Sequence, residues 1–320
     1  EDEIHQVCPI AYWHLWDDSG QAPPEYNRVL YESTDLLNCI NWPTYSYLKK
    51  WYPEKTNFVP HALPTELFHP ISEADAAKFK RQALPNTSVD EFVVLWIARN
   101  ARRKMPGDVL CSWKLFLEQL QRKHGHKKAT LVMHTDPLDS EGPNLFQIVE
   151  YLGIRDRVVF SKERITFQDM NVLYGIADCV INNSSNEGCG LPTLEAMQCG
   201  KPIIAMKTGG LTRQVIDHRD GSFNGVPIEP DVHCLVGSQL VPYIFEEFAK
   251  HETIAGCFMQ MYDLGPEKRR ALGEKARQYV LSEFDLKKTI QDWDASLEKT
   301  IKTWRQNRVN WECIELGTKR

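Results

Sequence analysis

The sequence lacks several features that would direct it to a membrane or to nucleic acid. It contains no run of 18 or more apolar residues, so no segment of it predicts a membrane-spanning helix. Its first residues show no secretory signal pattern. The formal net charge of −5 gives no electrostatic reason to expect a nucleic-acid partner. It also has no internal repeat and no low-complexity tract.

A disulfide framework and a zinc motif are absent as well. The nine cysteines are odd in number and scattered, and none lies in a C-x-x-C pair or at zinc spacing from histidines. We therefore expect reduced thiols, a cytoplasmic location and no bound metal.

The 320 residues are 42% apolar and 25% charged, which is ordinary for a globular protein with one large or two smaller domains. Short apolar runs alternate with amphipathic patterns between about 90 and 230, and this alternation predicts a doubly wound parallel sheet of Rossmann-like α/β type. The predicted strands are 91–98, 128–135, 156–162, 177–184 and 201–210, and the predicted helices are 113–125, 144–153, 166–177, 192–200 and 211–218.

The two ends of the chain differ from this middle part. The first 60 residues predict only about two βα units, too few for a complete doubly wound domain, and the proline-rich 57–72 predicts a connector. From about 255 onward the pattern is helical. The segment 231–262 resists assignment, although 238–251 is compatible with a helix that has an aromatic face.

The most specific motif is the stretch NEGCGLPTLEAMQCGKPIIA, which begins at residue 186. Pro192 at the first turn of a short helix places Glu187 on the loop before it and Glu195 about one turn inside. Between the two acids, glycine-rich backbone meets a helix N-terminus, which favours an anion. Either acid alone is more simply explained as a solvated carboxylate. Together they suggest a ligand with hydroxyls and phosphates, such as a nucleotide sugar.

This string resembles the signature of retaining glycosyltransferases with the GT-B fold, in particular glycosyltransferase family 4. The resemblance covers most of 55–290. It implies an incomplete acceptor-side domain at 1–63, a nucleotide-sugar donor domain at 64–285, and a helical segment at 286–320 that packs back on the first part. The acceptor domain would then be completed by residues upstream of Glu1.

The segment ARNARRK resembles the family's G-R-x-x-x-x-K motif, with Arg99 and Lys104 at the cationic positions and Ala98 in place of the usual glycine. The resemblance implies that these cations stabilise a departing diphosphate without a metal, which agrees with the charge that develops on such a leaving group. A solvated basic loop is the plainer reading of the motif taken alone.

The resemblance also implies roles along the donor site. Glu195 would bind ribose hydroxyls, Glu187 the transferred sugar, and Phe160 and the residues after it the base. The diphosphate would lie against the loop and helix start formed by Gly188, Cys189, Gly190 and Leu191. The same loop would be bordered by Gly209 and Gly210, where small residues leave room for ligand.

CPIAYWHLWDDS resembles the family strand that delivers a histidine into the cleft between the domains. His14 is the candidate to reach the sugar or acceptor, and Asp17 or Asp18 to orient an acceptor hydroxyl. A packed structural histidine beside Trp13 and Trp16 is equally compatible with this sequence.

The resemblance therefore implies a metal-independent retaining hexosyltransferase, in which the leaving phosphate accepts the acceptor's proton. The donor would be a UDP- or GDP-linked sugar, used without any other cofactor. The acceptor would be a carbohydrate, or be linked to lipid or protein, with peripheral membrane contact and no nucleic acid. The alternative is a nucleotide-sugar-binding module that needs a missing region or a partner for turnover. An epimerase or a phosphorylase of the same fold fits the glutamate string less well.

Overall fold

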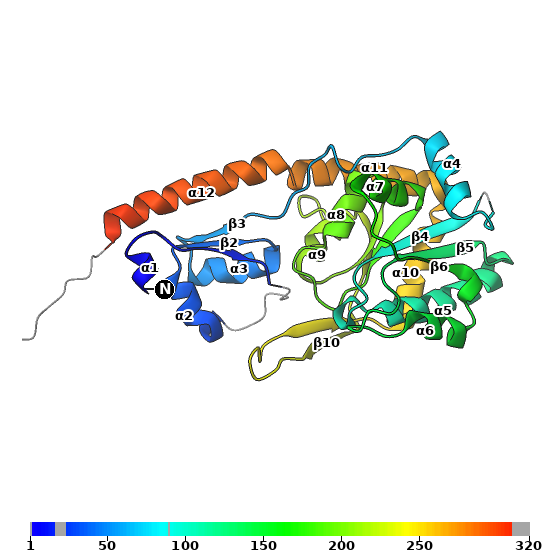
Figure 1. Ribbon diagram of the computed structural model, residues 1–320, viewed down its shortest axis with the longest axis horizontal. Coiled ribbons are helices and arrows are strands. Elements are labelled where there is room, and N and C mark those ends of the chain that lie inside the picture. The colour runs from blue at the N-terminus through cyan, green and yellow to red at the C-terminus, as the bar shows by residue number, and fades with distance from the viewer. Residues whose placement is uncertain (1, 17–23, 89, 309–320) are drawn as a thin grey trace, which may run out of the picture.

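The computed structural model describes residues 2–16, 24–88 and 90–308 (Figure 1). These residues form a three-stranded sheet near the N-terminus and a six-stranded sheet in the middle of the chain, with a two-stranded hairpin following it. A long C-terminal helix runs from the second unit along the first. Among the described residues, no helix has the length and apolarity that crossing a bilayer requires.

The six-stranded sheet is entirely parallel and has the order β6-β5-β4-β7-β8-β9. This is the strand order of the doubly wound dinucleotide-binding fold, with the reversal of winding between β4 and β7. The predicted α/β fold is thereby confirmed. The strands are β4 (Phe92–Ile97), β5 (Ala129–His134), β6 (Val158–Ser161), β7 (Cys179–Asn182), β8 (Ile203–Met206) and β9 (Gly225–Ile228).

Helices cover both faces of this sheet (Figure 1). On one face α5 packs against α6 and α10, and on the other α7 packs against α4 and α8 against α11. The strands are apolar throughout because both faces are covered, as in β4, where five successive residues are buried. The helices are α4 (Glu73–Ala83), α5 (Pro106–His124), α6 (Leu145–Leu152), α7 (Phe167–Ile176), α8 (Leu191–Gln198), α9 (Gly209–Val215), α10 (His251–Asp263) and α11 (Gly265–Glu283).

Local signals set the helix ends. Thr166 caps α7 by accepting a hydrogen bond from the amide of Asp169, as the capping-box pattern predicts. Gly125 and Gly153 follow α5 and α6 with positive φ of 76° and 66°, a conformation that glycine adopts without strain. Helix α5 begins at Pro106, seven residues before its predicted start at 113. The residues that extend it continue the helical spacing of buried apolar positions, since Val109 and Leu110 lie one turn before Trp113.

The N-terminal unit is a parallel sheet of order β1-β2-β3, with helices α1, α2 and α3 and a 3₁₀ turn at Pro24–Asn27. The last helix, α12, lies along it, as the resemblance implied (Figure 1). Trp293 meets Trp13 edge to face at 5.4 Å between ring centroids, and Ser296 accepts a hydrogen bond from Asn38. The bounds are α1 (Asp2–His5), β1 (Ala11–His14), α2 (Arg28–Ser33), β2 (Leu36–Cys39), α3 (Trp42–Trp51), β3 (Thr56–Phe58) and α12 (Leu286–Asn307).

A second contact joins the two units at α9. The guanidinium of Arg213 lies 4.0 Å from the ring centroid of Trp42 and 4.8 Å from that of Phe58, while Glu283 pairs with it from α11. A guanidinium held over aromatic rings and largely removed from water is a favourable contact. These contacts therefore hold α9 and α11 against the N-terminal unit.

The helix considered for 238–251 is wrong. Residues on either side of 240 form an antiparallel hairpin, β10 (Val232–Leu235) and β11 (Phe245–Phe248), and α10 begins only at His251. The pairing aligns Val232 with Phe248, which is 16 residues away. These residues are strands because of that distant pairing, and the local spacing of apolar residues does not indicate it. In Figure 1 this hairpin, labelled at β10, projects from the lower side of the second unit.

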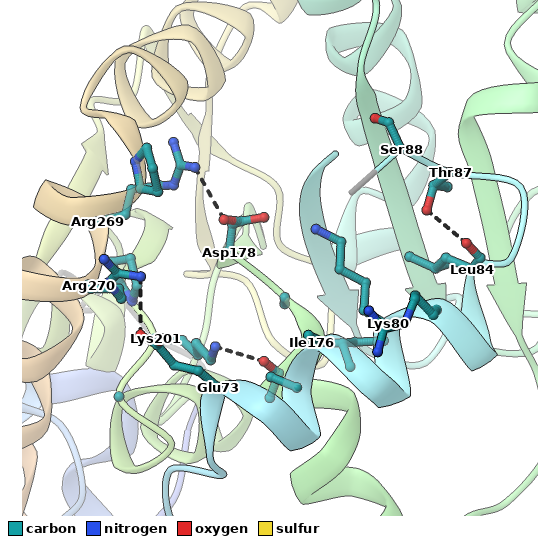
Figure 2. A pocket seen from close by; sticks show the side chains of 18 of the residues that line it. Glu73, Lys80, Leu84, Thr87, Ser88, Ile176, Asp178, Lys201, Arg269 and Arg270 are labelled. Carbon is teal, nitrogen blue, oxygen red and sulfur yellow. Dashed lines mark hydrogen bonds and ion pairs between the residues drawn. The ribbon is translucent and has the colours of Figure 1, made fainter. Parts of the chain in front are cut away.

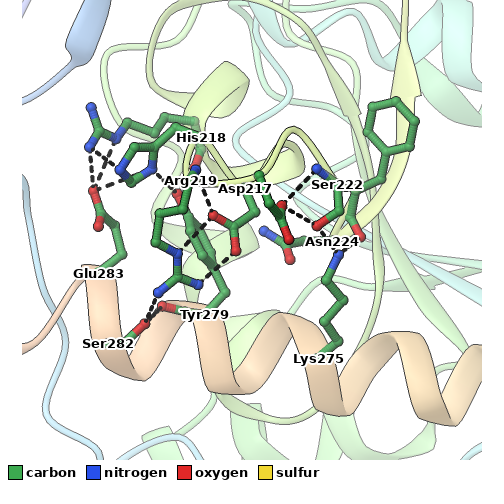
Figure 3. A network of polar contacts seen from close by, with 12 residues as sticks. Asp217, His218, Arg219, Ser222, Asn224, Lys275, Tyr279, Ser282 and Glu283 are labelled. Atoms are coloured by element: carbon green, nitrogen blue, oxygen red, sulfur yellow. Dashed lines mark hydrogen bonds and ion pairs between the residues drawn. The ribbon is translucent and has the colours of Figure 1, made fainter.

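Figure 3 shows a polar network that ties the turn before β9 to α11. The carboxylate of Asp217, only 5% exposed, pairs with Arg219 through both oxygens, and this pairing holds the pKa of Asp217 down at about 2. Lys275 of α11 donates to the carbonyl of Phe223, and the hydroxyl of Tyr279 donates to the carbonyl of Arg213. The network fixes α9, and with it the loop that α9 contacts, on the rigid C-terminal helices.

Candidate active site

The site forms where the winding of the six-stranded sheet reverses. Strands β4 and β7 are parallel neighbours, so their carboxyl ends meet at one edge. The chain leaves β4 into the basic segment 98–104 and leaves β7 into the glutamate loop, 183–190. Ligands of doubly wound sheets bind in the crevice outside these strand ends. The fold thus brings together two motifs that are about 80 residues apart in the sequence.

Glu187 is the centre of this arrangement, with only 7% of its surface exposed. Its Oε2 accepts a short hydrogen bond from Lys104 Nζ and another from the hydroxyl of Ser184 at 3.2 Å. A guanidinium nitrogen of Arg103 lies 3.6 Å from the same oxygen. Two cations therefore hold one buried carboxylate, and their combined charge exceeds its own.

Arg103 is a cation at this site that the sequence analysis missed. Its guanidinium also donates to the carbonyl of Asn186, inside the glutamate loop. Arg99, the residue that the motif indicates, instead pairs with Asp139 through two hydrogen bonds, and 62% of its side chain is exposed. The structure brings Lys104 to Glu187 but does not bring Arg99 there. The run of three basic residues, 102–104, was the available signal for Arg103.

At Gly190, where a phosphate cradle is predicted, the structure shows a glycine turn that leads into an uncapped helix. Gly190 is the residue before α8 and has a positive φ of 82°, and no side chain caps the helix at this position among the described residues. Leu191, the first residue of α8, is 39% exposed. Pro192 has no N–H and the amide of Thr193 donates to the carbonyl of Gly190, so the amide of Leu191 is the one that this first turn can offer to an anion. Gly188 and Cys189 belong to the same loop, with Cys189 buried and its carbonyl bonded to Gln214.

Gly209 and Gly210 were expected to leave room for a ligand. The structure gives another explanation for glycine at these two positions. A Cβ on Gly209 would lie 2.0 Å from the carbonyl oxygen of Glu187, and the amide of Gly210 donates to that oxygen at 2.9 Å. The two glycines therefore allow the start of α9 to pack directly on the glutamate loop. The space they leave is filled by backbone, and the contact fixes the loop.

Glu195 lies one turn inside α8, as predicted. Its Oε2 accepts a hydrogen bond of 2.6 Å from the hydroxyl of Tyr174, a completely buried residue of α7. Burial raises the pKa of Glu195, and the hydrogen bond from Tyr174 opposes that rise. Tyr174 was not among the predicted site residues. Its hydroxyl orients the carboxylate and favours the ionised form.

Two other predicted residues lie in packed surroundings. Phe160 is on β6, the edge strand, where its ring meets Phe146 edge to face at 5.1 Å. His14 ends β1 and is completely buried, with its Nε2 3.0 Å from the hydroxyl of Tyr31, and burial lowers its pKa to about 4. Asp17 and Asp18 lie outside the described residues.

A cavity of about 710 Å³ opens beside the cations, between the N-terminal unit and the hairpin. The hairpin is tied to the site because Glu246 pairs with Arg102 through both oxygens and the amide of Glu247 donates to Ser185. On the other wall the hydroxyl of Tyr26 donates to the carbonyl of Leu240. The lining residues are mostly apolar or aromatic apart from a polar end near the glutamate loop: Leu15, Trp16, Tyr26, Asn27, Arg102, Arg103, Asn186, Leu240, Val241, Tyr243, Ile244 and Glu246. We call this space the hairpin cleft.

Within the part of the chain that the structure describes, no three His, Cys, Asp or Glu side chains gather as a metal site would require. The groups available to a ligand at the switch point are two cations, the buried carboxylates Glu187 and Glu195, and the backbone at the start of α8. These groups suit an anion that carries hydroxyls.

Sequence comparison identifies relatives of this chain. A model of the family described as glycosyl transferases group 1 matches residues 78–232. The D-inositol 3-phosphate glycosyltransferase of Stackebrandtia nassauensis is 31% identical over 228 residues, which cover 68% of this chain and 49% of that protein. The enzyme of the same name from Acidothermus cellulolyticus is 29% identical over 215 residues, covering 63% of this chain and 46% of it. The chain thus spans at most about half of the length of these relatives.

Solved structures share the fold. HepE of Anabaena, solved in complex with UDP and glucose, superposes with a TM-score of 0.68 at 19% identity, covering 91% of this chain and 72% of that one. Sucrose-phosphate synthase of Thermosynechococcus elongatus gives a TM-score of 0.64 at 22% identity, covering 95% and 69%. These neighbours are glycosyltransferases of the GT-B type. Residues 78–232 thus match the glycosyl transferases group 1 family, and the chain has the GT-B fold.

Proposed function

We propose that this chain carries the donor site of a retaining glycosyltransferase that transfers a sugar from a nucleoside diphosphate to an acceptor hydroxyl. The observation that carries the proposal is the buried contact of Glu187 with Lys104 and Arg103, at the switch point of the sheet and beside the uncapped start of α8. A diphosphate there would meet two cations and the amide of Leu191 at the helix start, groups that stabilise the charge of a departing phosphate.

We assign the roles along the site from this geometry. Lys104 and Arg103 would contact the diphosphate, with Arg99 joining them only after release from Asp139. Glu187 would bind the hydroxyls of the transferred sugar, and Glu195, held by Tyr174, those of the ribose. Carboxylates are strong acceptors for such hydroxyls. Phe160 and the residues that follow would border the base. Solved complexes of HepE with UDP and UDP-glucose support a uridine nucleotide as the first donor to test.

The reaction follows from these roles. The bond between the anomeric carbon and the diphosphate breaks, and the acceptor oxygen bonds to the same face of that carbon. The acceptor proton passes to the leaving diphosphate, so that no metal and no protein base is required. The hairpin cleft is our proposed acceptor site. Its aromatic and apolar walls suit the ring face of a sugar or an apolar aglycone.

The alternative function is a binding module that holds a nucleotide sugar without turnover. Both functions are compatible with a cytoplasmic protein, which the free thiols of the eight described cysteines support.

Calorimetric titration with UDP-, GDP- and ADP-sugars tests both functions, because failure of every donor to bind would refute both. Where a donor binds, Glu187→Ala should abolish transfer and donor hydrolysis and leave the affinity for free nucleotide nearly unchanged. Glu150→Ala, on an exposed surface pair, is the matched control. An unchanged rate in Glu187→Ala would remove Glu187 from the site, and donor binding without product would favour the module.

A further inference from the structure

A second cavity, of about 330 Å³, opens at the opposite edge of the six-stranded sheet (Figure 2). Residues directly before β7 and β8 line it, including Asp178 and Lys201, so it lies at the amino ends of these strands. Helix α4 forms one wall and the start of α11 another. The switch-point site lies at the carboxyl ends. We call this second space the basic pocket.

The basic pocket carries more positive than negative charge. Five basic side chains line it, namely Lys80, Arg81, Lys201, Arg269 and Arg270, against the two acids Glu73 and Asp178. Both acids are already paired, Glu73 with Arg270 at 3.1 Å and Asp178 with Arg269 at 3.2 Å (Figure 2). The charges of the two lysines are therefore not balanced by these carboxylates.

The lysines use little of their hydrogen-bonding capacity. Lys201 donates to the carbonyl of Gly175 at 2.8 Å and Lys80 to that of Glu91. Each ammonium has three donors, so each retains donors that no hydrogen bond among the described residues uses. Burial lowers the pKa of Lys201, the negative charge of Asp178 opposes this, and the charge of Lys80 lowers the pKa further. The two ammonium groups thus repel one another within reach of a single cavity.

Arg269 adds a buried charge to the same wall. Only 8% of this residue is exposed, and its Nε is buried without a hydrogen-bond partner among the described residues. No side chain caps α11, which begins at Gly265, in the part of the chain described, and Pro266 of its first turn lines the pocket. A buried cation is costly unless an anion compensates it. Asp178 does this for Arg269, so the donors that remain for a ligand on this wall are the Nε of Arg269 and those of the two lysines.

We propose that the basic pocket binds a small phosphorylated molecule, a phosphate monoester, at a site separate from the donor site. A monoester carries about two negative charges near neutral pH, which matches the two lysines. Its carbon portion would lie against the apolar part of the lining, Ala76, Ala77, Leu84 and Ile176. The cavity volume lies at the lower end of the range of small-molecule sites, roughly 300–1,000 Å³. This site is independent of the transfer reaction proposed above.

Calorimetry on the full chain at constant ionic strength tests the proposal, with glycerol 3-phosphate, inorganic phosphate and glycerol as probes. We expect saturable binding of glycerol 3-phosphate, tighter than that of inorganic phosphate and absent for glycerol. Lys80→Gln and Lys201→Gln should each weaken it at least tenfold. Lys80 is the safer variant for folding, because it is only partly buried. Lys288→Gln, which removes a lysine of an exposed pair on α12, should have no effect.

Three results would overturn the proposal. One is the absence of saturable binding to the wild type. Another is an unchanged affinity in Lys80→Gln, which would assign the binding to general charge attraction. The third is loss of glycerol 3-phosphate binding in Lys104→Gln, which would place the molecule at the switch point. Because this last variant acts at the other sheet edge, the proposals for the two sites can fail independently.

Discussion

Replacing Tyr174 by Phe removes a single hydroxyl and should weaken the binding of a nucleoside diphosphate through Glu195. The hydroxyl donates a hydrogen bond of 2.6 Å to the carboxylate and is itself completely buried. This bond lowers the pKa of Glu195 against the effect of burial, which raises it. Without the bond, the pKa of Glu195 should rise further, so that protonation begins at a higher pH and the carboxylate loses its acceptor strength.

The magnitude follows from the bond that the nucleotide would lose. A hydrogen bond to a charged group contributes about 1.5–3 kcal/mol, which corresponds to about 10- to 150-fold in Kd. Glu195→Gln removes the charged acceptor and should show a loss within this range at every pH. Tyr174→Phe should show a smaller loss at pH 8 that approaches that of Glu195→Gln as the pH is lowered to 5.5. The difference between the two variants should therefore shrink with falling pH.

Calorimetric titration with UDP and GDP between pH 5.5 and 8 measures these affinities. Tyr151→Phe is the matched control, because that tyrosine is 89% exposed on α6. Thermal unfolding shows whether the variants remain folded. The raised folded pKa of Glu195 means that the folded state binds more protons than the unfolded state, so wild-type stability falls as the pH rises from the unfolded pKa of this acid through its folded pKa. Glu195→Gln should lack that fall. If both variants bound nucleotide like the wild type at all pH values, the assigned role of Glu195 would be refuted.

The other predictions concern the cations, the loop network and the cleft. Arg103→Gln should weaken nucleoside diphosphate binding by about 10-fold or more, and Arg99→Gln should weaken it by less, because only the first cation is at the glutamate loop; the reverse order in calorimetry would contradict this. Asp217→Asn should lower the free energy of unfolding at pH 7 by about 1–2 kcal/mol. Since the pairing with Arg219 holds the pKa at about 2, the wild type's advantage should persist above pH 4 and vanish as the pH falls through 2. Denaturant titration would count against the network if the two proteins were equally stable at pH 7. Tyr243→Ala should raise the acceptor's KM without changing donor affinity, and an unchanged KM would exclude the hairpin cleft as the acceptor site.

The sequence predicted most of the second unit because its signals are local. Each buried strand is a short apolar run, and the turns around α8 contain the proline and glycine that the geometry needs. Glu187 on the loop and Glu195 inside the helix followed from Pro192 alone. The meeting of Lys104 with Glu187 followed from the strand alternation, since parallel strands end at one edge.

The sequence did not predict contacts that depend on side-chain direction or distant pairing. Arg99 and Arg103 lie on the same short turn, and only the folded loop decides which of them points to Glu187. Tyr174 reaches Glu195 from the preceding crossover helix, and no periodicity marks its hydroxyl as a partner. The hairpin depends on the pairing of Val232 with Phe248, so its apolar residues, considered locally, were equally compatible with a helix.

The two edges of the sheet acquire positive charge in different ways. Crossover helices begin at the carboxyl ends of parallel strands, so helix starts such as that of α8 contribute partial positive charge to the switch point, and two cations beside Glu187 suffice there. The same helices end at the amino edge and bring partial negative charge, which basic side chains can cap. Lys201 does this for α7 at Gly175, and Arg277 for α8 at Gln198. Capping, however, uses one donor of Lys201 and leaves Lys80 beside it. The positive charge that remains after these helix ends are capped is what a ligand in the basic pocket would neutralise.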